Sequence, residues 1–154
     1  RLFRVSAALF LADAHLREEV FGPSSILVEC ASLAEMEAVA RVLPGQLTGT
    51  IQAAASDLAT AGPLADALTQ RVGRLLWNGF PTGVEVCSAM VHGGPYPATT
   101  DSRSTSVGTT AIERFVRPVC FQNAPQELLP AELQNANPRG IWRSIDSEFS
   151  KNAV

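Results

Sequence analysis

The sequence predicts an α/β domain in which helices flank a mainly parallel sheet. Short apolar runs typical of strands alternate, over residues 1–78, with segments whose apolar residues recur at helical spacing. The connections between these segments are short, which is typical of βαβ units. Of the 154 residues, 46% are hydrophobic and 18% are charged, so the chain is expected to fold as a single globular domain.

Two strands and one helix are predicted in the first third of the chain. Residues 7–11 and 25–31 are apolar runs typical of strands. Ser32 and Glu35 have the spacing of a capping box, in which each side chain bonds a backbone amide near the other residue. Apolar residues then recur at helical spacing as far as the Pro-Gly pair at 44–45, which predicts that the helix ends there.

The next segment repeats the order strand, helix, strand. Residues 47–51 contain β-branched side chains that favour a strand. The Gly-Pro pair at 62–63 is typical of a first helical turn, and Gly73 is expected to cap the carboxyl end of that helix. Residues 74–78 are predicted to form the last strand of this part.

The composition changes after residue 78. Residues 79–103 are rich in glycine and proline without a regular period, which predicts a long loop that is either functional or mobile. A helix is predicted around 104–114 and a strand at 117–122. Residues 124–154 are interrupted by prolines and are expected to form a tail.

Charge and cysteine content exclude several classes of function. The net charge is −3 without a cluster of Lys or Arg, so nucleic acid and acidic membranes are not expected as partners. No apolar run approaches the roughly 20 residues of a membrane span. Cys30, Cys87 and Cys120 are far apart, which argues against a disulfide framework and a metal site and favours a reducing, cytoplasmic setting. Cys30 and Cys120 lie in apolar runs and are expected to be buried.

An acidic segment stands directly before the predicted strand at 25–31. Glu19 is followed by Phe21 and by the Gly-Pro pair at 22–23, which places carboxylates at the mouth of the sheet. A carboxylate accepts hydrogen bonds from two hydroxyl groups, and an aromatic ring offers a flat apolar wall. From the residues alone, a solvated acidic loop with its Phe packed in the core is the favoured interpretation.

The pattern Glu-Xaa-Phe-Gly-Pro at 19–23 resembles the aldehyde dehydrogenase superfamily. Other segments are similar as well: 73–78, the Gly-Gly segment at 90–97, and 137–143. Residues 78–86 continued by 97–103 are similar to the branch of the family that oxidises α-ketoglutarate semialdehyde and prefers NADP. The resemblance therefore covers essentially the whole chain.

The resemblance implies roles for individual residues. Glu19 would hold the nicotinamide ribose of NADP or NAD, and Phe21 would pack near the nicotinamide ring. His92 stands where the family more often has an aromatic residue and would line the aldehyde pocket; a loop histidine bonded to backbone is an equal alternative. Arg103 could bind a substrate carboxylate, although a surface pair with Asp101 is favoured.

The resemblance also implies what lies outside the chain. In the family the cysteine nucleophile and the general base precede the motif, and here eighteen residues without Cys precede Glu19. We therefore expect a C-terminal fragment of the catalytic domain that has no catalytic residue and is inactive alone. Residues 1–123 would form a partial catalytic domain, whose strand near 116–122 pairs with a neighbouring subunit of a homo-oligomer, and 124–154 would form a C-terminal tail.

Two functions from different classes follow. The first is part of an NADP-dependent enzyme that oxidises a small semialdehyde to the carboxylic acid. The second is a non-catalytic α/β oligomerisation module without an active site of its own.

Overall fold

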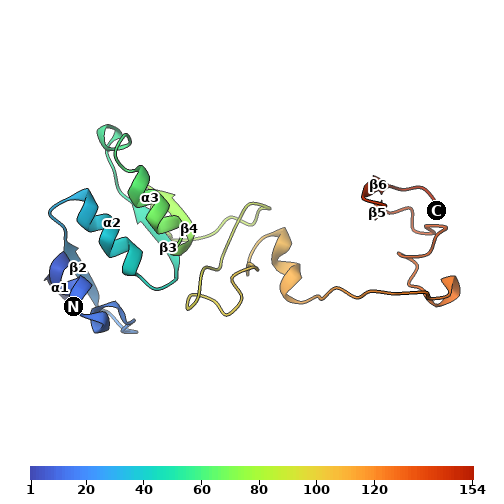
Figure 1. Ribbon diagram of the computed structural model, residues 1–154, viewed down its shortest axis with the longest axis horizontal. Coiled ribbons are helices and arrows are strands. Elements are labelled where there is room, and N and C mark those ends of the chain that lie inside the picture. Colours follow the sequence, from blue (N-terminus) through green and yellow to red (C-terminus); the bar gives the residue numbers. More distant parts are fainter. The chain divides into compact units, whose positions relative to one another are not determined.

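A computed structural model describes all residues, Arg1–Val154, as two compact units, Arg1–Val116 and Arg117–Val154 (Figure 1). The first unit holds all three α-helices and four of the strands. The helices are α1 (Ala7–Ala12), α2 (Leu33–Val42) and α3 (Gly62–Thr69). The four strands of the first unit are β1 (Leu2–Ser6), β2 (Ser25–Glu29), β3 (Gln46–Ile51) and β4 (Val72–Trp77). The second unit contains β5 (Arg143–Ile145) and β6 (Glu148–Ser150). Short 3₁₀ helices occupy Ala14–Arg17, Ala55–Asp57, Thr109–Arg114 and Gln126–Leu128.

The predicted α/β class and the parallel strand pairing are confirmed. β1 pairs in parallel with β2, so that Phe3 lies opposite Ile26, and β3 pairs in parallel with β4. The one predicted sheet is, however, divided into these two pairs, because β2 and β3 are not hydrogen-bonded to each other. The helices contact one another in the order α1, α2, α3.

The prediction of a strand at 7–11 is wrong. Strand β1 lies before it, and residues 7–12 form helix α1. Ser6 begins the helix, because its Oγ accepts a hydrogen bond from the amide of Leu9 at 3.2 Å. Alanine and leucine are strong helix formers, so an apolar run of this composition suits a buried helical turn as well as a strand.

Helix α2 is confirmed with its predicted cap. The Oγ of Ser32 accepts a hydrogen bond from the amide of Glu35 at 3.2 Å. The Glu35 carboxylate reaches one residue beyond the expected position and accepts from the amide of Ala31 at 2.7 Å. The helix ends directly before Leu43, as the Pro-Gly pair at 44–45 predicted.

The expected helix cap at Gly73 is also wrong, because this glycine lies inside strand β4. A Cβ atom at this position would stand 1.9 Å from the carbonyl oxygen of Gly93. The glycine is therefore required by the close approach of two backbones rather than by the end of a helix.

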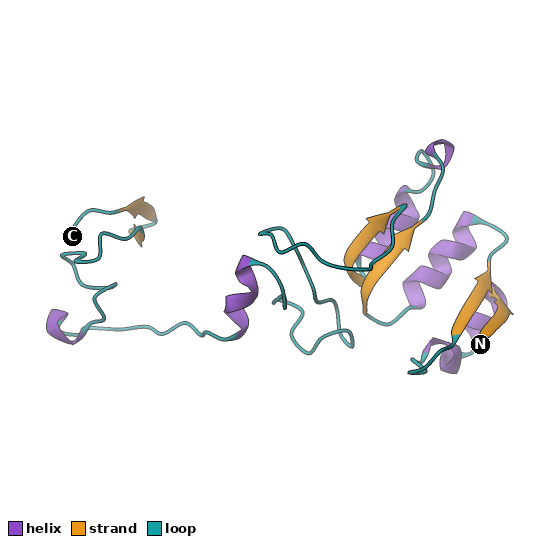
Figure 2. Ribbon diagram, turned by 180° about the vertical axis from the view of Figure 1, so that it is seen from behind, coloured by secondary structure: helices purple, strands orange, loops and turns teal.

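The segment after β4 is drawn as loop as far as the 3₁₀ helix Thr109–Arg114 (Figure 2). The predicted helix at 104–114 is thus shorter and of a different type. Residues 117–122 form no strand in the single chain, and Cys120 is exposed rather than buried. A strand needs a hydrogen-bonded neighbour, and the single chain supplies none here.

The second unit contains an antiparallel hairpin, β5–β6, that the sequence did not predict. The buried Asn137 organises it: the side-chain amide donates to the carbonyls of Ile141, at 3.0 Å, and Lys151, at 2.7 Å. Arg143 donates to the carbonyls of Gln134 and Asn152 at 2.6 and 2.9 Å. Polar side chains rather than apolar packing therefore hold this unit together.

The apolar core is small and lies between the helices and strands of the first unit. Its largest member, Phe10, is 4% exposed, and no large side chain is completely buried. The buried hydrophobic residues are Ala7, Phe10, Ala40, Ile51, Ala61, Ala67 and Val72. None of the helices has the length and apolar character needed to cross a membrane.

Candidate functional site

The loop that carries Glu19 and Phe21 connects the 3₁₀ helix Ala14–Arg17 to β2. Asp13 caps the 3₁₀ helix by accepting from the amide of His15 at 2.9 Å. At the other end of the loop, the amide of Ser25 donates to the carbonyl of Arg1 at 2.9 Å. Both ends of the loop are thus fixed, and its central residues are exposed.

Two adjacent carboxylates in this loop have different environments. Glu18 pairs with the Nδ1 of His15 at 3.0 Å. Glu19 is exposed and makes no side-chain hydrogen bond or ion pair with the chain. Its oxygens are therefore available as hydrogen-bond acceptors.

Glu19 belongs to the lining of a cavity of about 1090 Å³. The cavity lies between β2 and β3, with Phe10 and Val39 among its apolar lining residues. Residues 17–19 and 97–98 also line it. An exposed acceptor in this lining is available to a ligand that approaches from solvent.

Phe21 points away from the core. Its side chain is 97% exposed, and it lines none of the cavities described here. The interpretation in which this Phe packs in the core is therefore wrong. An aromatic ring of this exposure can cover a flat ligand or another part of a protein.

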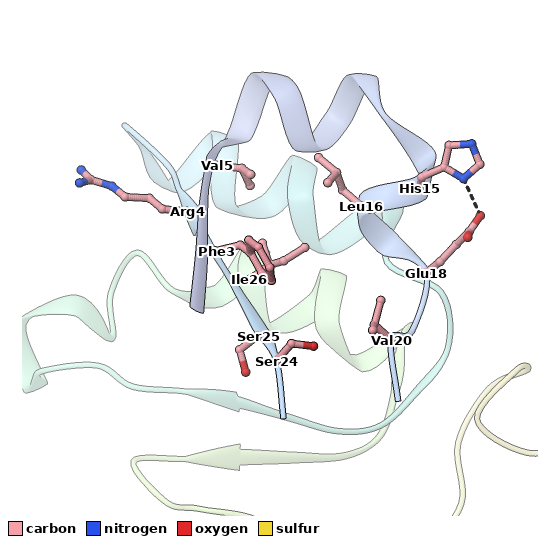
Figure 3. Close-up of a pocket in the computed structure, with 10 residues that line it drawn as sticks. All are labelled: Phe3, Arg4, Val5, His15, Leu16, Glu18, Val20, Ser24, Ser25 and Ile26. Atoms are coloured by element: carbon pink, nitrogen blue, oxygen red, sulfur yellow. Dashed lines mark hydrogen bonds and ion pairs between the residues drawn. The ribbon is translucent and has the colours of Figure 1, made fainter. Parts of the chain in front are cut away.

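A second cavity, of about 610 Å³, lies over the β1–β2 pair (Figure 3). Phe3 and Ile26, opposite each other in the ladder, form part of its apolar wall. Arg4 lines it too, and its guanidinium donates to Glu29 at 2.5 Å. The hydrogen bond from Arg4 is the main cause that lowers the pKa of the Glu29 carboxyl group.

His92 is fixed through its backbone. Its amide donates to the Oγ1 of the buried Thr105 at 2.8 Å, and its carbonyl accepts from the amide of Ser106 at 2.9 Å. The residue is exposed and is not part of the lining of either cavity. The structure brings Glu19 and Phe21 together in one loop and leaves His92 in a separate one.

Arg103 and Asp101 form the favoured surface pair, with the Nε of Arg103 at 3.3 Å from the carboxylate. The amide of Arg103 also donates to this carboxylate, at 3.1 Å. The backbone bond first, and then the side-chain bond, lower the pKa of Asp101. The guanidinium is therefore already engaged within its own turn.

Sequence reasoning missed a seam of close backbone contacts that holds the loop after β4 against the strands. Gly73 meets Gly93, as described above. A Cβ on Gly94 would stand 2.4 Å from the carbonyl oxygen of Gln46, and one on Gly45 would stand 2.1 Å from that of Pro95. The sequence does carry a signal, because glycine recurs in both segments that form the seam. The spacing of these glycines along the chain does not, however, predict which of them lie against each other.

The residues present suit a nicotinamide nucleotide better than a metal ion. No group of three His, Cys, Asp or Glu side chains is placed to hold a metal. The free carboxylate of Glu19 and the open ring of Phe21, two residues apart, offer an acceptor for sugar hydroxyls beside an apolar surface. Both residues therefore fit the group that the sequence resemblance implies.

Comparison with known proteins gives the relatives of the chain. It is 53% identical over 147 residues to α-ketoglutaric semialdehyde dehydrogenase 2 of Azospirillum brasilense, covering 96% of this chain and 28% of the relative. It is 51% identical over 152 residues to α-ketoglutaric semialdehyde dehydrogenase of Acinetobacter baylyi, covering 98% of this chain and 29% of the relative. No protein-family model matches the chain. The identity extends over nearly the whole chain, which therefore belongs to the aldehyde dehydrogenase family and spans less than a third of the length of these relatives.

Proposed function

We propose that the chain forms the C-terminal part of the catalytic domain of an aldehyde dehydrogenase. The longer protein would oxidise a small semialdehyde, of the α-ketoglutaric semialdehyde class, to the carboxylic acid with NADP or NAD. The names of both relatives support this substrate class. The observation that carries the proposal is the exposed, unpaired carboxylate of Glu19 beside the exposed ring of Phe21.

Glu19 would bind the nicotinamide ribose. Its two carboxylate oxygens accept hydrogen bonds only, and vicinal ribose hydroxyls supply two donors. Such bonds to a charged acceptor are stronger than neutral ones. Glu19 therefore orients the nucleotide, while its neighbour Glu18 is engaged by His15.

Phe21 would provide an apolar wall beside the nicotinamide ring. The bound nicotinamide supplies a hydride acceptor. The ring of Phe21 would restrict where that acceptor can lie and would exclude water from one side of it. His92 would lie in the aldehyde pocket, where its exposed side chain could donate to a polar substrate group.

The nucleophile would come from another part of the longer protein. None of the three cysteines lines either cavity beside the Glu19 loop. Cys30 is in addition a poor thiolate, because burial first, and the nearby Glu35 second, raise its pKa. The chain alone is therefore proposed to be inactive, and its three free thiols suit a reducing compartment such as the cytoplasm.

Nucleotide titration of the longer protein with Glu19→Gln tests the role of Glu19. Loss of the charge should weaken binding of NADP or NAD by about 10- to 100-fold, because hydrogen bonds to a charged acceptor are lost. Titrating both nucleotides also determines which one is preferred. Glu18→Gln is the matched control, because it removes the same charge one residue away and should leave affinity within about twofold.

Equal affinity and turnover for Glu19→Gln and the unchanged protein would remove Glu19 from the nucleotide site. An equal loss in both variants would show that only the local charge matters.

A non-catalytic oligomerisation module is a second candidate. The observation that favours it is the exposed apolar run near residues 116–122, in which Val116 and Val119 are 59% and 57% exposed. Apolar side chains on an unpaired extended segment favour association with another chain. A homo-oligomer would also be compatible with the first candidate.

A further inference from the structure

The buried hydroxyl group of Thr105 makes every hydrogen bond that a hydroxyl group can make. Thr105 is 5% exposed. Its Oγ1 accepts from the amides of His92, at 2.8 Å, and Val107, at 3.3 Å, and it donates to the carbonyl of Val107 at 2.9 Å. A hydroxyl group has one proton to donate and two lone pairs with which to accept. The hydroxyl of Thr105 therefore has no capacity left for a ligand, and what it does is hold its neighbours.

The segment 104–106 holds both backbone groups of His92. Besides the bond to Thr105, the carbonyl of His92 accepts from the amide of Ser106 at 2.9 Å. At the next residue, a Cβ atom added to Gly93 would stand 3.0 Å from the carbonyl oxygen of Ser104. Because its amide and carbonyl are both engaged, His92 can move its exposed imidazole only by rotation about its side-chain torsions.

The seam of backbone contacts described above holds the same segment against the strands. Gly73 in β4 meets Gly93, and Gln46 at the start of β3 meets Gly94. Residues 97–98, a few positions further along the chain, line the cavity to whose lining Glu19 also belongs. The segment that carries His92 is therefore fixed both to Thr105 and to strands that lead to this cavity.

We propose that Thr105 is a positioning residue, which sets the place of His92 in the aldehyde pocket and thereby the selectivity for a polar semialdehyde. This inference rests on the proposed function, which gives His92 its place in that pocket. Thr105 touches no substrate, because its hydroxyl is buried and fully bonded. It acts through the backbone of His92. A displacement of about 1 Å in a group that orients a substrate can lower the rate by about 100-fold.

The hydroxyl group, rather than the shape of the side chain, carries this role. Valine has nearly the shape of threonine but offers neither a donor nor an acceptor. Thr105→Val would thus leave the part-buried amide of His92 and the carbonyl of Val107 without these partners. Serine keeps the hydroxyl and loses only a methyl group. The two substitutions therefore separate the hydrogen bonds of Thr105 from its volume.

A double-mutant cycle in the longer protein tests the proposal, with kcat/KM measured for α-ketoglutaric semialdehyde at saturating nucleotide. Thr105→Val should lower kcat/KM by about 10- to 100-fold, because His92 is misplaced. In a His92→Ala background the same substitution should lower it by less than about threefold, because the group that Thr105 positions is already gone. Thr105→Ser should stay within about threefold of the unchanged protein.

Two controls separate misplacement of His92 from loss of folded protein. The stoichiometry of nucleotide binding counts the folded sites, and kcat/KM is expressed per site. Thr69→Val removes the bond from a hydroxyl to the carbonyl of Asp66, 2.8 Å long, at the end of α3, and should leave kcat/KM within about twofold. If Thr105→Val binds no nucleotide, Thr105→Ala takes its place in the cycle, because it removes the hydroxyl without adding bulk.

Equal losses in the two backgrounds would overturn the proposal, because Thr105 would then support the fold and not His92. An unchanged kcat/KM for Thr105→Val would also overturn it, as would a loss in Thr105→Ser as large as that in Thr105→Val. These results leave the proposed function intact. Failure of the unchanged longer protein to oxidise the semialdehyde would instead overturn the proposed function, and this inference with it.

Discussion

Two adjacent glutamates show how much of a residue's role depends on its neighbours in space. Glu18 and Glu19 are identical in chemistry and next to each other in sequence. Glu18 is paired with His15 at 3.0 Å, whereas Glu19 has no partner in the chain. Spacing alone could not tell which of the two is free, and the assignment of Glu19 came from the family pattern at 19–23.

Replacing Phe21 separates a role in binding from a role in folding. In the longer protein, Phe21→Ala should weaken nucleotide binding by about 2- to 10-fold, because an aromatic wall is lost. Its melting temperature should change little, since the side chain is 97% exposed. Calorimetric titration and thermal melting measure the two effects. Phe80→Ala, which removes another exposed ring, serves as the control; a variant Phe21→Ala that binds nucleotide normally would contradict the role.

The Arg4–Glu29 pair predicts a pH dependence of stability. The hydrogen bond from Arg4 lowers the pKa of Glu29 from its usual value of 4.5. A carboxyl group with a lowered folded pKa contributes stability that is present above the unfolded pKa and is lost as the pH falls through the folded pKa. The stability difference between the unchanged chain and Glu29→Gln should therefore be larger at pH 7 than below pH 4.5.

Denaturant titrations of the chain at both pH values measure this difference. The expected effect is small, because the pair is exposed to solvent. Glu113→Gln is the control, since Glu113 forms no ion pair. Parallel pH curves for Glu29→Gln and the unchanged chain would show that the Arg4 pair adds no stability.

At the scale of elements, the sequence predicted helices α2 and α3 and strands β2 to β4, because caps, breakers and periodicity mark them. It failed for residues 7–12, where an Ala- and Leu-rich run satisfies the pattern of a buried helix and of a strand. It also missed the hairpin of β5 and β6, whose strands have only three residues each. The side chains of Asn137 and Arg143 stabilise the second unit by donating hydrogen bonds to backbone carbonyls. Hydrophobic periodicity does not predict contacts of this kind.

The seam between β4 and the following loop gives a prediction at this scale. Gly73→Ala should destabilise the chain by about 1–3 kcal/mol, because overpacking forces backbone shifts. The added Cβ would lie 1.9 Å from the Gly93 oxygen, which belongs to the backbone and has little room to move. Gly83→Ala is the matched control, since a Cβ there meets nothing within 4 Å. Chemical denaturation of both variants measures the difference, and equal midpoints would refute the close contact.

At the scale of the whole molecule, alternation of strands and helices predicted the α/β class but also one continuous sheet. The structure has two parallel pairs instead. The sequence of this chain predicts only the strands that the chain itself contains. It cannot predict a strand that another stretch of polypeptide could place between them. The sparse core and the many exposed apolar side chains would have the same basis, which is that polypeptide outside this chain would cover these surfaces in the longer protein.

These exposed side chains predict self-association of the chain. Sedimentation at micromolar concentration should show a dimer or larger assembly, because exposed apolar patches and unpaired extended segments associate. Phe121→Asp should shift the population toward monomer, whereas Phe149→Asp, which alters an exposed Phe in β6, should not. A monomer at all micromolar concentrations would contradict the proposed oligomer.

The glycine seam also has a consequence for enzyme engineers. Gly45, Gly73, Gly93 and Gly94 fasten the start of β3 and β4 to residues 93–98 through main-chain atoms, so these contacts are indifferent to the side chains of residues 80–91. A library of variants that diversifies residues 80–91 and retains the four glycines should keep the same attachment of the loop to β3 and β4. Residues 80–91 could then be exchanged as one segment without altering these close contacts.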